Sequence, residues 1–202
     1  MSRHRAGSPS PRRARPRPKP AGDSIAVLLD EWRRERPDLD PSPFAIFGRI
    51  WRLGATLSNE IAEWLAPLGL NFESFSVIVT LRRSGAPYEL NPTALYRDSL
   101  ISSGAITNRI DRVEAAGLVK RLPDPKDRRG TIVRLTPKGR ALADKAIALH
   151  FRKLADCISG MSSRDQASLA ALLANLLQTV ETRGKPPGAR RRKHRPVAAF
   201  GA

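Results

Sequence analysis

The sequence predicts a mainly α-helical fold with one small β-hairpin. Two observations carry this expectation. Between residues 23 and 182 most apolar residues recur three or four positions apart, which is the spacing of one buried helix face. Between residues 118 and 135 two short runs rich in Leu and Val flank a stretch of turn-forming residues, which is the pattern of a hairpin. The chain has 202 residues, enough for one domain of ordinary size with extensions.

Both ends of the chain are expected to be disordered basic tails. The formal net charge is +17, and residues 1–21 and 183–202 each hold seven Lys or Arg residues and no acid. These Pro/Arg/Gly-rich segments bury too little apolar surface to offset the entropy lost on ordering. The tails either contact nucleic-acid phosphates or serve only to keep the chain in solution.

Three helices are expected in the first half of the chain. The first spans about residues 23–36 and stops before a proline. Ser42 and Pro43 then open a second helix, as an N-cap followed by proline at the first helical position. That helix keeps its apolar stripe to residue 66, and a third runs over about 72–83.

Two shorter helices follow and predict a helix-turn-helix. Asn91, again followed by proline, opens a helix that runs through Ser99. Ser102 or Ser103 caps the next helix after a turn of three or four residues, and that helix stops at Gly117. Two short helices joined by such a turn are typical of DNA-binding modules.

The second of these helices has a polar face opposite its apolar one. Its apolar face carries Ile106, Ile110 and Val113, so the opposite side is free for contacts. Short hydrogen-bonding groups and a cation on that side suit base edges and phosphates in a major groove. An ordinary solvated helix face is the alternative. The polar face consists of Ser103, Thr107, Asn108, Asp111 and Arg112.

The hairpin predicts a wing beside this helix. "LVKRL" (118–122) and "TIVRL" (131–135) are the expected strands, and residues 123–130 form an eight-residue loop. Arg128 and Arg129 are expected at its tip, where a guanidinium can enter a narrow minor groove. Asp127 is placed to orient one of them. A plain charged turn is the alternative, but its position after a helix-turn-helix favours a winged helix-turn-helix.

Two helices are expected to complete the chain. Thr136 and Pro137 start a long one, and Ser163 with Gln166 forms a capping box for the last. The last helix has a broad apolar stripe, which suits either a homodimer interface or packing on the preceding helix. A two-fold dimer matches palindromic DNA half-sites. The stripe consists of Leu169, Leu172, Leu173, Leu176, Leu177 and Val180.

This order of elements, and above all "GAITNRIDRVEAAGLVKRLPDPKDRRGTIVRLTPKGRAL" (104–142) with the D-x-R signature at Asp127 to Arg129, resembles the MarR family of winged-helix regulators. The resemblance covers roughly residues 40–182. It implies a homodimer that binds palindromic operators, usually as a repressor, and that often releases DNA when a small anionic or aromatic ligand binds.

On this basis the chain divides into four parts. Residues 1–21 and 183–202 are the tails, and 22–182 form the winged-helix domain. Within that domain, dimerisation helices occupy about 23–66 and 140–182, and the DNA-binding lobe occupies about 70–138.

The extra first helix resembles the urate-responsive branch of PecS and HucR-like proteins. The resemblance implies a ligand pocket that includes Trp32, Arg97, Asn108 and Arg109, with Ser76 where the branch has Asp. A hydroxyl supplies no charge, so an anion is expected to rely on the two arginines. Alternatively, these arginines pair with neighbouring Asp residues or with DNA phosphate.

The leading hypothesis is therefore a dimeric, sequence-specific transcriptional regulator that binds double-stranded DNA in the cytoplasm, at the nucleoid. The alternative is a nonspecific basic nucleic-acid-binding protein whose affinity comes from the tails. No enzyme is expected, because there is no phosphate-binding loop, no HExxH motif and no His in the basic module of residues 109–140. A single cysteine, Cys157, predicts neither a disulfide framework nor a metal site, and no cofactor is expected. No apolar stretch reaches the roughly 18 residues that a membrane span needs.

Overall fold

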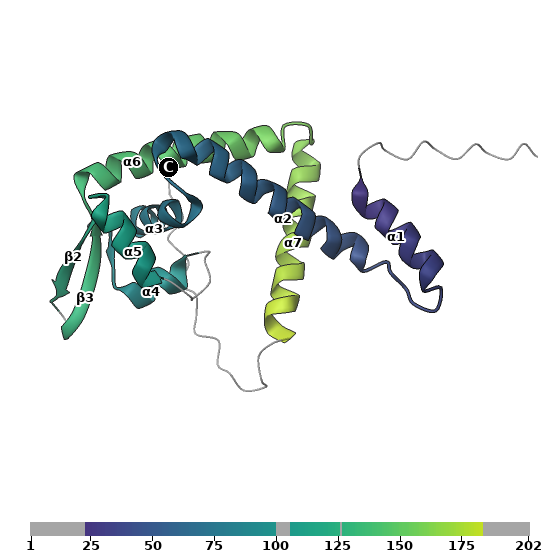
Figure 1. Ribbon diagram of the computed structural model, residues 1–202, viewed down its shortest axis with the longest axis horizontal. Coiled ribbons are helices and arrows are strands. Elements are labelled where there is room, and N and C mark those ends of the chain that lie inside the picture. The colour runs from purple at the N-terminus through teal and green to yellow at the C-terminus, as the bar shows by residue number, and fades with distance from the viewer. Residues whose placement is uncertain (1–22, 100–105, 126, 184–202) are drawn as a thin grey trace, which may run out of the picture. The chain divides into compact units, whose positions relative to one another are not determined.

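The computed structural model describes residues 23–99, 106–125 and 127–183, with the side chain of Arg128 excepted (Figure 1). The predicted tails lie outside the described residues, apart from Arg183, and so do the candidate caps Ser102 and Ser103. The described residues fall into two compact units. One ends at Glu63 and the other begins at Trp64.

The first unit contains α1 (Ser24–Glu35) and most of α2 (Phe44–Leu65). Asp23 caps α1, because its carboxylate accepts a hydrogen bond from the backbone N–H of Ile25 at 3.1 Å. The same carboxylate pairs with Arg49 on α2, which joins the two helices by charge.

The predicted cap of α2 is wrong. The hydroxyl of Ser42 donates to the carboxylate of Asp40 at 2.7 Å, and the helix begins at Phe44. An ionised carboxylate two residues upstream is a stronger acceptor for the hydroxyl proton than other groups within its reach, so it sets the Ser42 rotamer.

The core of the second unit lies where α3 (Phe72–Arg83) packs on α6 (Pro137–Cys157). Six residues of α3 are buried, so its apolar positions surround the helix rather than forming a single stripe. The first turn of α6 passes very close to the chain before the hairpin. A Cβ built on Gly139 would stand 1.9 Å from the carbonyl oxygen of Leu118, so only glycine fits there.

An aromatic cluster holds the middle of α6. The imidazole of His150 lies 4.9 Å from the ring of Phe75 and 5.7 Å from that of Trp64, between ring centroids. Both Nδ1 of His150 and Nε1 of Trp64 are buried without a hydrogen-bond partner in the described part of the chain. Desolvation lowers the pKa of His150 from its ordinary value of 6.5.

A three-stranded antiparallel sheet, in the order β1-β3-β2, forms the other side of the second unit. β2 (Val119–Asp124) and β3 (Asp127–Leu135) make the predicted hairpin, and β1 (Glu89–Leu90) adds a short third strand. β1 was not predicted, since two residues are too few to show an alternation.

The last two helices follow the predicted order. Thr136 caps α6 by accepting from the N–H of Gly139 at 3.0 Å, as expected. The capping box of α7 (Ser163–Arg183) is displaced by one residue from its predicted place. Ser162 exchanges hydrogen bonds with Asp165, whose shorter acidic side chain reaches the cap at 2.7 Å.

The amide of Gln166, expected in the box, donates instead to the carbonyl oxygens of Met161 and Ile158. In the described residues no single helix is long and apolar enough to span a membrane. One bent pair, Phe44–Leu68 with Phe72–Arg83, meets that test only when its helices are joined across a 76° break.

Candidate nucleic-acid interface

The first helix of the predicted helix-turn-helix is α4 (Pro92–Asp98). The side chain of Asn91 accepts from the N–H of Ala94 at 2.8 Å, which confirms the predicted cap. Leu95 is fully buried, and it anchors this short helix to the core of the lobe.

The second helix, α5 (Ile106–Ala115), presents two distinct faces. Ile110 and Val113 are each only 1% exposed, so the predicted apolar face packs inward. The helix ends as expected at Gly117, which has a φ of +72°. The N–H of Leu118 then reaches back to the carbonyl oxygen of Val113 at 2.8 Å. This stop fixes the direction in which the wing leaves the helix.

The outward face of α5 carries Thr107, Asn108 and Arg112, all exposed. The fourth predicted contact, Ser103, lies outside the described residues. Arg109 is half-buried on the flank of the helix. The exposed set combines a hydroxyl, an amide and a guanidinium, groups that donate to and accept from base edges and phosphates.

One arginine on the wing ties α5 to the sheet. The guanidinium of Arg121 on β2 donates to Asp111 at 2.5 Å and also pairs with Glu114. The backbone N–H of Arg121 donates to the second oxygen of Glu114 at 2.8 Å. Burial lowers the pKa of Arg121, but the hydrogen bonds that its guanidinium donates to Asp111 and Glu114 raise the pKa by more, so the net shift is upward. Asp111 on the outward face is therefore paired with a cation, and the wing is fixed to α5.

The wing differs from its predicted form. β2 and β3 are longer than expected, and residues 125–126 alone join them, so the eight-residue loop is wrong. Pro123 pairs with Thr131, but Asp124 pairs with Asp127, which leaves residues 128–130 without partners. Three extra residues on one strand form a bulge. Arg128 and Arg129 thus lie in a bulge of β3 rather than at the tip.

Two acidic residues and a glycine shape this bulge. The carboxylate of Asp127 accepts from the backbone N–H of Arg129 at 3.0 Å, so it orders the backbone of the bulge. A Cβ on Gly130 would stand 2.9 Å from the Cβ of Asp124, which is closer than real Cβ atoms approach. The side chain of Arg129 is exposed beside this ordered turn.

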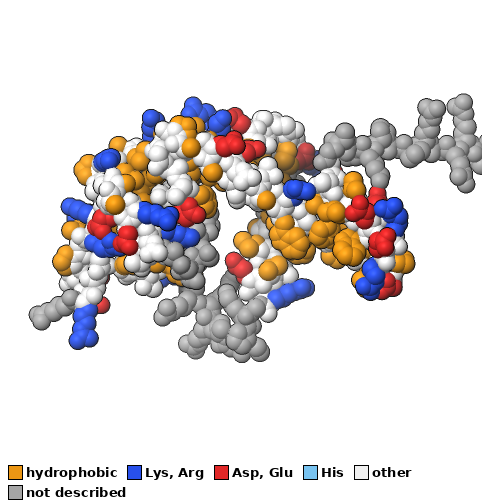
Figure 2. Space-filling view, in the orientation of Figure 1, with side chains coloured by type: hydrophobic (Ala, Val, Ile, Leu, Met, Phe, Trp, Pro, Cys, Tyr) orange, Lys and Arg blue, Asp and Glu red, His pale blue; other side chains and the backbone are white. Residues whose placement is uncertain are grey.

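Further cations surround α5 and the wing. Lys138 donates to the carbonyl oxygen of Ala116 at 2.9 Å, at the negative end of α5. Lys120 is exposed on β2. In Figure 2 Lys and Arg side chains lie over the wing, including its far end. This surface favours a polyanion.

The predicted ligand residues are divided between the two units. Trp32 lies on α1 in the first unit, whereas the other four belong to the second. Ser76 is buried on α3, and Asn108 is exposed on α5. Arg97 pairs with Asp98 at 2.9 Å, as one alternative expected, and this hydrogen bond raises the pKa of its guanidinium.

Sequence reasoning missed the role of Arg121. Its partners lie seven and ten positions earlier on a different element, so only the strand register reveals the contact. A second missed pair joins Glu89 on β1 to Arg134 on β3 at 2.5 Å. Within the described ranges no group of three or more His, Cys, Asp or Glu side chains is arranged to hold a metal.

Comparison with known proteins places this geometry among DNA-binding regulators. The sequence model of the MarR family matches residues 70–131. The chain is 32% identical to the HTH-type transcriptional regulator PecS of Dickeya dadantii over 152 residues, which cover 75% of this chain and 92% of that protein. It is 30% identical to the multiple antibiotic resistance protein MarR of Escherichia coli over 57% of this chain and 78% of that protein.

Solved structures agree with this result. A mutant of E. coli MarR complexed with operator DNA superposes with a TM-score of 0.60 at 26% identity, covering 68% of this chain and 96% of that one. AbsC from Streptomyces coelicolor, at 21% identity, shares the fold with a TM-score of 0.64 over 71% of this chain and 97% of its own. PecS and AbsC are both named as transcriptional regulators.

Proposed function

Since the chain belongs to the MarR family of transcriptional regulators, within its PecS-like branch, we propose that it is a homodimeric repressor that reads a palindromic operator. One observation supports this most strongly. The exposed polar face of α5 and the basic wing are held in a fixed relation by Arg121, which pairs with two carboxylates of α5. A rigid helix beside a rigid hairpin suits simultaneous contact with neighbouring grooves.

In this proposal α5 enters the major groove. Thr107 and Asn108 contact base edges, and Arg112 contacts a base or a phosphate one turn later. Ser103, which precedes the described part of α5, joins this set. A bidentate amide contact from Asn108 is worth about 1–3 kcal/mol of discrimination between bases.

The wing contacts the adjacent minor groove through Arg128 and Arg129. Narrow minor grooves carry an enhanced negative potential that attracts guanidinium groups. The bulge supports this role, because Asp127 and Gly130 order the backbone from which Arg129 projects. A preordered arginine loses less conformational entropy on binding than one on a free loop.

The second subunit is proposed to pack against the apolar stripe of α7. Leu172 is 67% exposed, and no residue of α7 is buried within the chain. Large exposed apolar patches mark interaction sites. The proposed dimerisation helices are 23–66 and 140–182, the DNA-binding lobe is 70–138, and residues 1–21 and 183–202 are tails that add nonspecific phosphate contacts.

The test of operator recognition begins with a duplex selected from a random pool by the full-length protein. Fluorescence anisotropy at fixed salt then compares this duplex with a shuffled one, for the full chain and for residues 22–183. Our proposal expects the trimmed chain to keep its preference for the selected duplex. A nonspecific, nucleoid-associated binder would lose nearly all affinity with its tails, and that result would refute operator reading.

The test of the dimer places a charge on the α7 stripe. We expect Leu172→Glu to yield monomers by light scattering and to weaken binding to the selected palindrome by at least about tenfold, since a carboxylate cannot be buried unpaired. Gln178→Glu, on the opposite face of the same helix, is the control and should remain dimeric. A dimeric Leu172→Glu protein would rule out this interface.

We also propose that an anionic or aromatic ligand releases the DNA. The branch-derived set of Trp32, Ser76, Arg97, Asn108 and Arg109 supplies two guanidiniums, and a carboxylate ligand would have to compete with Asp98 for Arg97. A thermal-shift screen with urate and related carboxylates tests this. Because Ser76 carries no charge, urate is expected to give no shift.

A further inference from the structure

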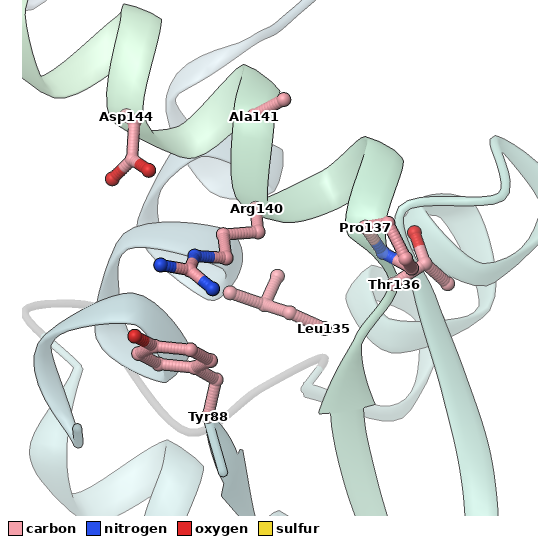
Figure 3. Close-up of a pocket in the computed structure, with 7 residues that line it drawn as sticks. All are labelled: Tyr88, Leu135, Thr136, Pro137, Arg140, Ala141 and Asp144. Atoms are coloured by element: carbon pink, nitrogen blue, oxygen red, sulfur yellow. The ribbon is translucent and has the colours of Figure 1, made fainter. Parts of the chain in front are cut away.

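A pocket opens beside Tyr88 in the second unit, where β3 ends and α6 begins (Figure 3). Its volume is about 460 Å³, which falls in the range of small-molecule sites, roughly 300–1,000 Å³. The lining includes Tyr88, Leu135, Pro137, Arg140, Ala141 and Asp144. No lining residue belongs to the proposed DNA contacts or to the ligand set derived from the PecS-like branch.

The backbone around Tyr88 holds its ring at the pocket. Tyr88 has a φ of +61°, an unfavourable conformation for a residue with a Cβ. Two hydrogen bonds maintain it. The N–H of Tyr88 donates to the carbonyl oxygen of Gly85 at 2.7 Å, and the N–H of Leu135 donates to the carbonyl oxygen of Tyr88 at 3.1 Å. The backbone of Tyr88 is thus held on one side by the turn before β1 and on the other by the end of β3.

The charges around this ring do not balance. The guanidinium carbons of Arg82 and Arg140 each lie 4.8 Å from the ring centroid of Tyr88. Arg82 also donates to Asp144 at 2.6 Å, so the one carboxylate of the pocket is matched. Arg140 has no ion-pair partner among the described residues, and it extends from α6 toward Tyr88 in Figure 3. Two guanidiniums against one carboxylate leave a local charge of +1.

We propose that this pocket binds a small organic carboxylate. The guanidinium of Arg140 offers paired N–H donors that match a carboxylate, and the phenol of Tyr88 offers an O–H donor. Leu135, Pro137 and Ala141 supply apolar walls for the carbon body of the ligand. The positive end of the 21-residue helix α6 adds a favourable field for an anion.

The shape of the site favours a small molecule over a DNA phosphate. A backbone phosphate contacts exposed cations and has no carbon body to fill an apolar hollow. The pocket instead combines a single unpaired cation with aliphatic and aromatic walls. Such a combination is typical of sites for small organic ligands.

The experiment titrates the full-length protein, without DNA, against 4-fluorobenzoate and the neutral isostere 4-fluorobenzamide, followed by ¹⁹F NMR. We expect saturable binding of the carboxylate and at least about tenfold weaker binding of the amide. Arg140→Gln should weaken carboxylate binding about tenfold or more, because it removes a charge-assisted pair. Arg152→Gln, an exposed residue of the same helix outside the pocket, should bind like wild type.

The proposal is wrong if the wild-type protein shows no saturable binding of the carboxylate, or if it binds the amide with equal affinity. It is also wrong if Arg97→Gln abolishes carboxylate binding while Arg140→Gln does not. Circular dichroism melts establish that each variant is folded. If the carboxylate fails to bind while Arg140→Gln weakens operator binding, the pocket contacts DNA phosphate and the proposal is wrong. The operator selection uses no carboxylate. A negative result in the ¹⁹F titration therefore does not affect the test of operator recognition.

Discussion

Removing the guanidinium of Arg121 should loosen the wing and weaken operator binding together. Arg121→Met keeps the length and apolar stem of the side chain but removes its bonds to Asp111 and Glu114. The backbone N–H of residue 121 can still donate to Glu114, as it does at 2.8 Å in the native chain. The perturbation is therefore confined to the two ion pairs.

The expected loss of stability follows from the exposure of the partners. The side chain of Asp111 is 54% exposed, so solvent screens its pair with Arg121, and that pair contributes about 0.5 kcal/mol. Glu114 is 34% exposed and more shielded, so its pair contributes about 1 kcal/mol. The free energy of unfolding should fall by about 1.5 kcal/mol in total.

The affinity of Arg121→Met for the operator should also fall, for a separate electrostatic reason. Without Arg121 the carboxylate of Asp111 stands uncompensated on the outward face of α5, where it repels DNA phosphates. We expect a Kd about tenfold higher, equivalent to about 1.4 kcal/mol. Urea unfolding gives the stability, and fluorescence anisotropy with the selected duplex at fixed salt gives the affinity.

A double-mutant cycle with Glu114→Gln decides whether the contact itself is responsible. Residues in direct contact should show a coupling energy of at least about 0.5 kcal/mol. If the two single effects simply add, or if Arg121→Met matches the control Arg152→Met in both assays, then Arg121 does not hold the wing to α5.

Three other predictions concern the core, the aromatic cluster and the wing. Gly139→Ala should lower the free energy of unfolding by more than about 3 kcal/mol, since its Cβ would overlap the carbonyl oxygen of Leu118. Gly160→Ala is the control, because a Cβ there meets nothing within 4 Å. Similar urea midpoints for the two variants would contradict this prediction. The pKa of His150 is lowered in the fold, so the unfolded chain takes up its proton first, and stability should fall as the pH drops below about 6.5. His150→Phe should fall less over the same interval, and an identical pH profile would contradict burial of the neutral imidazole. Arg129→Ala should weaken operator binding by about 1–3 kcal/mol at fixed salt with unchanged stability, and an unchanged gel-shift titration would remove Arg129 from recognition.

Local signals in the sequence were sufficient for the helices. Asn91 and Thr136 cap their helices as predicted, because each side chain finds its N–H partner three residues along the same chain. Where a second acceptor or donor lay equally near, the prediction failed. Asp40 attracts the hydroxyl of Ser42, and Asp165 replaces Gln166 in the capping box.

Features that depend on pairing between strands were not predictable from local signals. The bulge at residues 128–130 arises because Asp124 pairs with Asp127, a shift in register that no periodicity shows. The pocket beside Tyr88 was likewise not predictable from local signals. Its ring, its cations and its walls come from three segments that only the fold brings together.

Pro123 lies on β2, which is an edge strand of the sheet. A hairpin that projects from a lobe exposes the unpaired backbone of its outer strand, which invites strands of other molecules to join and aggregate. Pro123 has no N–H to offer such a neighbour, and Lys120 adds a charge that like-charged copies repel. The other edge strand of the sheet, β1, is only two residues long, so it offers few backbone groups for pairing. These features should keep concentrated protein from forming intermolecular sheets.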